Sequence, residues 1–84
     1  MNTDVIEAYK AKMVAGVIYK NMKIEFIELN DNGILLKVIL NKINKEKNSI
    51  GVFKYDNIKY CFLLPLDKSE LLVNIPSKYI KTKP

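Results

Sequence analysis

The sequence predicts an α+β domain in which an N-terminal helix precedes a five-stranded antiparallel sheet, bent or partly closed as a small barrel. Two observations predict this class. Apolar residues near the start recur at spacings of three and four, and from residue 22 onward runs of β-forming residues alternate with turn residues. A chain of 84 residues can bury one core but not two. We therefore expect a single domain with a helix over residues 1–20, a β-rich core over 22–80 and a basic tail over 81–84.

The first segment, residues 3–20, has the features of an amphipathic helix. Thr3 can cap its start, and Asp4 and Glu7 suit the positive end of the helix dipole. Its apolar stripe comprises Ile6, Tyr9, Met13 and Val17. Because Gly16 is followed by β-branched residues, an alternative ends the helix near Ala15 and begins a strand at residues 17–20.

The strands are predicted from runs of β-forming residues between turns. Residues 22–29 and 34–43 flank the turn at residues 30–33, whose Asn-Gly dipeptide is the strongest short-range signal for a hairpin. Residues 50–55 and 58–66 flank a second turn at Asp56 and Asn57. Residues 71–75 form the fifth strand, which ends at Pro76 because proline cannot donate to a ladder.

This order of elements is that of SH3-like and Sm-like barrels. Residues 76–80, Pro-Ser-Lys-Tyr-Ile, resemble the Pro-Ser-x-Tyr-Val ending of SH3 domains. The chain has no tryptophan, the residue that lines the peptide groove of SH3 domains, and no acidic-aromatic opening segment. The resemblance therefore covers five residues, and we do not assign the chain to that family.

The composition argues against catalysis and against metal or cofactor binding. Histidine is absent, which removes the usual general base and the commonest metal ligand. With one cysteine, Cys61, the chain cannot supply the ligands of a structural zinc site, and an internal disulfide is excluded. Residues 28–33 imitate half of a calcium loop, but position twelve would be Ile39 where a glutamate is needed. We expect a protein that is not an enzyme and has no cofactor.

Apolar residues on both faces of one strand predict a protein interface. In residues 34–43 the even positions and the odd positions both carry large apolar side chains, so neither face is plainly solvated. The face away from the core, with one residue of the fourth strand, forms our candidate interface: Leu35, Ile39, Ile43 and Leu63. Its occupant would be a protein partner or a second copy of the chain in a homodimer.

The charge distribution predicts an alternative function. Residues 1–36 hold four lysines and five acids, whereas residues 37–84 hold ten lysines and four acids. The basic half offers a candidate nucleic-acid surface, with Phe53 or Tyr55 as further stacking platforms: Lys42, Lys45, Lys47, Lys78, Tyr79, Lys81 and Lys83. Arginine is absent, which argues against reading of specific bases.

From these features we expect a small regulator, inhibitor or adaptor that acts by binding a protein, of the kind that mobile elements also encode. The alternative is a small β-barrel that binds nucleic acid without sequence specificity through lysine–phosphate contacts. No apolar run approaches the roughly 18 residues of a membrane span, and acids occupy the start where a secretory signal needs basic residues. We therefore expect a cytoplasmic location and no membrane partner.

Overall fold

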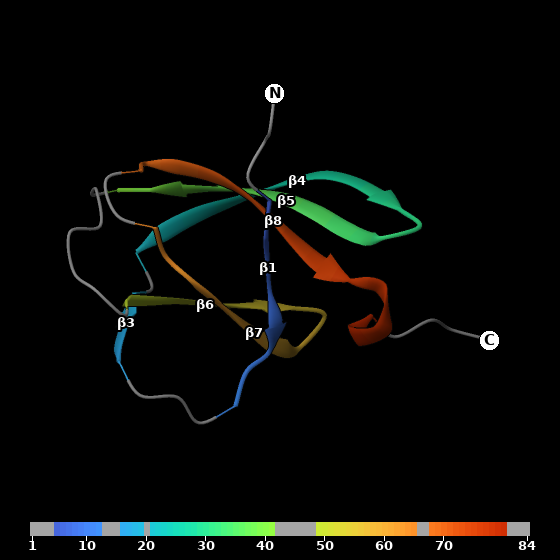
Figure 1. The fold of residues 1–84 in the computed structure, drawn as a ribbon, viewed down its shortest axis with the longest axis horizontal. Coiled ribbons are helices and arrows are strands. Elements are labelled where there is room, and N and C mark those ends of the chain that lie inside the picture. Colours follow the sequence, from blue (N-terminus) through green and yellow to red (C-terminus); the bar gives the residue numbers. More distant parts are fainter. Residues whose placement is uncertain (1–4, 13–15, 20, 42–48, 66–67, 81–84) are drawn as a thin grey trace.

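Two β-sheets packed face to face make up the fold (Figure 1). The computed structural model describes residues 5–12, 16–19, 21–41, 49–65 and 68–80. Within these ranges the one helical element is a turn of 3-10 helix, η1 (Ser77–Tyr79), and none of them contains a helix that could cross a membrane. The strands are β1 (Val5–Glu7), β2 (Tyr9–Lys10), β3 (Val17–Tyr19), β4 (Met22–Asn30), β5 (Gly33–Leu40), β6 (Ser49–Tyr55), β7 (Ile58–Leu63) and β8 (Glu70–Pro76).

The first sheet, called sheet A here, has the strand order β1-β8-β5-β4. Strand β1 runs parallel to β8, and the other neighbours are antiparallel. The hairpin β4–β5 closes where Asn30 pairs with Gly33. Gly33 has a φ of 132°, and a Cβ there would collide with the backbone oxygen of Ile75, so only glycine fits this position.

The second sheet, sheet B, has the strand order β2-β7-β6-β3. Strand β3 runs parallel to β6, and the other neighbours are antiparallel. Asp56 and Asn57 join β6 to β7 with φ values of 53° and 64°, as a two-residue hairpin turn with left-handed residues requires. The chain passes from sheet A to sheet B between β1 and β2, at Ala8, which is fully buried and donates its N–H to the Asn74 oxygen at 2.8 Å.

The core lies between the two sheets. Alternate residues of β5 and β8 face inward from sheet A, and alternate residues of β7 face inward from sheet B. Tyr60 is 1 % exposed, and its hydroxyl donates a hydrogen bond to the Tyr79 oxygen at 2.9 Å, which satisfies the one polar atom of this large side chain. The buried members are Ala8, Ile34, Leu36, Val38, Leu40, Tyr60, Phe62, Leu64, Leu71, Val73 and Ile75.

The predicted N-terminal helix is wrong, since the described residues of this segment form the strands β1, β2 and β3 and irregular connections beside them. Ile6 and Ala8 face the core at a spacing of two, and Gly16 has a φ of 126°, which no helix accepts. The segment is extended because it pairs with the free edges of two other strands. Strand β1 pairs with β8 and β2 pairs with β7, and these tertiary pairings override a local helical pattern.

The predicted barrel and the α+β class are also wrong, because the strands form two separate sheets that do not close. The five later strands correspond to β4 to β8, although β5 ends at Leu40 and β7 at Leu63, before their predicted ends, and both hairpins are confirmed by their pairing. However, β5 and β8 pair with each other, whereas β6 and β7 form the second sheet with β2 and β3. The residue pattern of each strand does not show which of the two sheets the strand belongs to.

Candidate protein interface

The outer face of sheet B is apolar because β6 alternates between two kinds of side chain. Gly51 and Phe53 face the core, and a Cβ at Gly51 would lie 2.5 Å from the Phe62 ring. Because side chains alternate along a strand, Ile50 and Val52 must point away from the core. Ile50 is only 6 % exposed although it lies outside the core cluster.

Strand pairing aligns apolar residues into two rows across this face. Tyr9 pairs with Cys61, which pairs in turn with Val52. In the second row Ile18 pairs with Ile50, which pairs with Leu63. The rows make up what we call the sheet B face, defined as Tyr9, Ile18, Ile50, Val52, Cys61 and Leu63.

Large parts of the sheet B face are exposed. Leu63 is 65 % exposed, Ile18 50 % and Tyr9 41 %. Single exposed apolar residues are normal on protein surfaces, but adjacent ones that share rows form a patch that calls for an explanation.

A hollow of about 320 Å³ opens beside Leu63. Ile50 and Phe62, both buried, are among its lining residues, and Glu7 is the one charged residue among the lining residues that the structure describes. The Tyr9 hydroxyl donates a hydrogen bond to Glu7 Oε1, and this bond, together with partial desolvation, raises the pKa of Tyr9 above its ordinary value. The hollow is lined by Ile6, Glu7, Tyr9, Ile50, Cys61, Phe62 and Leu63.

Two lysines border the sheet B face at the β6–β7 turn. Lys54 and Lys59 pair directly across the two strands, on the same side of the sheet as Val52 and Cys61. Neither forms an ion pair within the described part of the chain. Like charges directly opposite each other destabilise a sheet, so an acidic group from outside the chain would relieve this repulsion.

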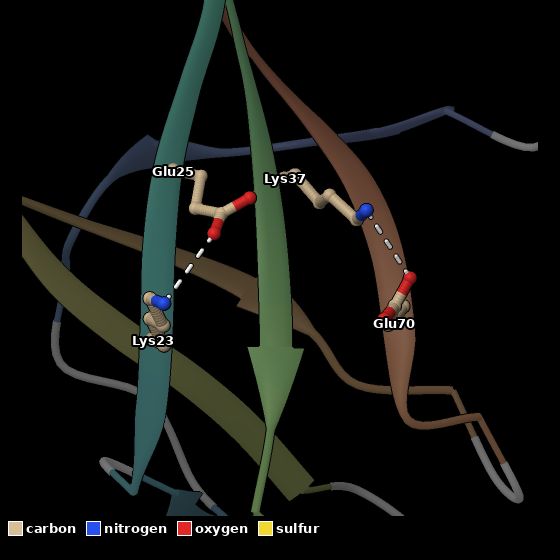
Figure 2. Close-up of polar contacts among 4 residues, drawn as sticks. All are labelled: Lys23, Glu25, Lys37 and Glu70. Carbon is tan, nitrogen blue, oxygen red and sulfur yellow. Dashed lines mark ion pairs between the residues drawn. The ribbon is translucent and has the colours of Figure 1, made fainter.

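The outer face of sheet A carries charges that lie beside charges of the opposite sign. Figure 2 shows four charged side chains on β4, β5 and β8, with Lys23 3.5 Å from Glu25 and Lys37 3.4 Å from Glu70. Glu25 also pairs with Lys37 across β4 and β5. Each of these charges therefore has an opposite charge beside it.

The structure separates the residues of the predicted interface. Leu35 and Ile39 lie half-buried on the outer face of sheet A, whereas Leu63 lies on the outer face of sheet B. Ile43 lies outside the described residues. Sequence reasoning missed five members of the sheet B face, namely Tyr9, Ile18, Ile50, Val52 and Cys61. The β-branched residues on either side of Gly51 were a signal for Ile50 and Val52.

Most of the predicted nucleic-acid surface falls outside the described residues, namely Lys42, Lys45, Lys47, Lys81 and Lys83. Lys78 and Tyr79 lie in η1, where the Lys78 ammonium sits 5.2 Å from the centre of the Tyr79 ring. The Tyr79 ring also meets Tyr9 edge-on at 5.6 Å. Phe53 stacks on Tyr60, and Tyr55 packs half-buried against the core. These aromatic rings are engaged within the chain.

The described residues contain no group of three His, Cys, Asp or Glu side chains placed to hold a metal ion. Comparisons of the chain with protein-family models, with curated proteins and with solved structures find no match.

Proposed function

We propose that the chain is a non-enzymatic binding domain, a small regulator, inhibitor or adaptor, that holds an acidic and apolar segment of a protein partner on the sheet B face. The observation that carries the proposal is the pair of apolar rows around Leu63, which is 65 % exposed beside a hollow of about 320 Å³. Burial of apolar surface stabilises a complex by about 25 cal/mol per Å², so these rows favour association.

The hollow and the two lysines indicate the chemistry of the partner. A hollow of about 320 Å³ lies at the small end of ligand pockets, which suits an apolar side chain inserted from a protein. The Lys54–Lys59 pair lies at the border of the face, where interfaces place their polar rim. Glutamates or aspartates next to the inserted side chain would meet these lysines.

The nucleic-acid hypothesis stays as the second candidate, because the same Lys54–Lys59 pair could meet phosphates. It predicts binding that depends steeply on salt and does not require Leu63. The protein hypothesis predicts that Leu63 is essential.

A peptide selection tests the proposal. We expect a random peptide library displayed on phage to yield peptides with a large apolar residue flanked by acids. The variant Leu63→Asp should lose about tenfold or more of the affinity for these peptides, because a carboxylate would enter an apolar contact and repel the acids. Leu29→Asp is the matched control, since Leu29 is 68 % exposed on sheet A and its substitution changes the charge equally.

Selected peptides that are basic, or that bind Leu63→Asp as well as the wild type, would contradict the proposal. Binding of a poly(dT) oligonucleotide that Leu63→Asp leaves intact, together with failure of the peptide selection, would favour the nucleic-acid hypothesis. Thermal unfolding of both variants checks that each remains folded.

A further inference from the structure

Strand β4 is a long edge strand of sheet A. It has nine residues, and among the described residues no strand lies on the side away from β5. The other edge strands, β1, β2 and β3, have two or three residues each. Exposed edges of this length offer unpaired backbone groups to a further strand.

The hydrogen bonds of β5 show which residues of β4 face the free edge. The Leu40 N–H donates to the Ser69 oxygen at 2.7 Å, away from β4, whereas the Asn41 N–H donates to the Asn21 oxygen at 3.4 Å. Leu40 pairs with Met22. Because backbone groups alternate in direction along an antiparallel strand, Met22, Ile24 and Phe26 direct their N–H and C=O groups to the free edge.

An irregularity limits the part of β4 that a further strand can use. The register with β5 shifts between Phe26 and Glu28, as in a β-bulge. A bulge bends its strand and increases the local twist, so the regular edge covers residues 22–26. Five residues at about 3.4 Å each span about 17 Å.

Charges on this segment distinguish the registers in which two copies of β4 could pair. Two-fold antiparallel pairing centred on Lys23 sets that lysine against Lys23 of the partner subunit, and pairing centred on Glu25 sets two glutamates together. Pairing centred on Ile24 sets Lys23 against Glu25 of the partner subunit, twice. It also aligns the edge-facing groups of Met22, Ile24 and Phe26, as hydrogen bonding between the strands requires.

We propose that two copies of the chain form a dimer by antiparallel pairing of residues 22–26 of β4, with Ile24 on the two-fold axis. Phe26, which is 58 % exposed, then lies opposite Met22 of the partner subunit and loses contact with water. The charged band of Lys23, Glu25 and Lys37 on sheet A, which Figure 2 shows in one copy, then continues across the axis with alternating sign. The pairing is short, so the dimer is weak, with a Kd of about micromolar or higher.

Charge reversal tests the register. We expect sedimentation to show a dimer of the wild type that forms with increasing concentration up to about 1 mM. Lys23→Glu and Glu25→Lys should each weaken it by about tenfold or more, because like charges then meet twice across the axis. The double variant should dimerise as the wild type does, and a mixture of the two single variants should form a heterodimer although both remain net positive.

Glu70→Lys is the matched control. It makes the same change of charge, and like Glu25→Lys it brings a second ammonium near Lys37, but it lies two strands away from the edge. It should leave the dimer intact. Loss of dimerisation in this variant, or equal association of all variants, would overturn the proposal.

Amide hydrogen exchange of the wild type gives a second measurement that does not depend on how a variant folds. The N–H groups of Met22, Ile24 and Phe26 should become protected as the protein is concentrated, whereas those of Lys23 and Glu25, which face β5, should be protected throughout. A wild type that stays monomeric at about 1 mM, or protection that does not change with concentration, would overturn the proposal.

Discussion

The outer faces of the two sheets differ in how their charges are arranged. On sheet A, Glu25 lies between Lys23 and Lys37, and Lys37 reaches Glu70. On sheet B, Lys54 faces Lys59 beside a row of exposed apolar side chains. One face is complementary to itself, whereas on the other no acid forms an ion pair with either lysine within the described part of the chain. We infer that the first suits a second copy of the chain and the second suits a different molecule.

This difference arises although both sheets share one core. Residues that face inward on β5, β7 and β8 are fixed by packing, because protein interiors are close-packed and tolerate little change. Outward residues on the same strands are free of that constraint. The two outer faces can therefore differ in chemistry without any change in fold.

The largest expected effect contrasts the two sides of β5. Val38 is fully buried, so Val38→Asp should cost about 3–5 kcal/mol and unfold a domain of this size. Ile39 points outward on the same strand and is half-buried, so Ile39→Lys should cost about 1 kcal/mol or less. Thermal unfolding of both variants measures the contrast. An unfolded Ile39→Lys variant would show that the outer face of sheet A is covered.

A smaller effect concerns the bond that ties the end of sheet A to sheet B. Tyr60→Phe removes the hydrogen bond from β7 to the Tyr79 oxygen, which should cost about 1 kcal/mol. If both sheets keep their places, binding at the sheet B face and dimerisation through β4 should both persist. Denaturant unfolding at neutral pH measures the cost, and a variant as stable as the wild type would contradict this contact.

The same tyrosine has a pH dependence with a definite sign. Burial, followed by the charge of Asp56, raises the pKa of Tyr60 above its ordinary value of 10.0. The unfolded chain therefore loses this proton first, so stability falls as the pH rises above about 10. Tyr60→Phe lacks this contribution, and its stability should approach that of the wild type as the pH increases. A constant difference between the two proteins across this range would contradict the assignment.

The smallest expected effects are opposite in sign on the two faces. Lys54→Glu replaces a pair of like charges with an opposite pair across β6 and β7, which should stabilise the fold by about 0.5 kcal/mol. Lys37→Glu sets a third acid between Glu25 and Glu70 and should destabilise the fold by a similar amount. Denaturant unfolding at low salt measures both. If both substitutions change the stability in the same direction, the proposed contrast between the charges of the two faces is wrong.

Local sequence signals predicted the hairpins but not the way in which the strands assemble. Turn residues such as Gly33, Asp56 and Asn57 have backbone requirements that a sequence shows directly. By contrast, β1 and β2 pair with strands more than 50 residues away, since Val5 pairs with Leu72 and Tyr9 with Cys61. A stripe at helical spacing gave no sign of these long-range pairings.

The candidate site shows the same limit. Leu63 was predicted from the sequence, but Tyr9 and Ile18 were assigned to a helix, with a strand at residues 17–20 as the alternative for Ile18. Leu35 and Ile39 were grouped with Leu63, although they lie on the other sheet. Which apolar residues share a face depends on which strands are adjacent and on which sheet they belong to. Only the register of β2, β7, β6 and β3 brings the sheet B face together.

Amide NMR spectra of the labelled protein test most directly whether the two surfaces have separate partners. Concentrating the protein should shift signals of β4, centred on Met22, Ile24 and Phe26. Adding a selected acidic peptide to dilute protein should instead shift Tyr9, Val52 and Leu63. Two separate sets of shifted signals are the result we predict. If concentration and peptide shift the same amides, one surface serves both, and the contrast between sheet A and sheet B does not determine what the protein binds.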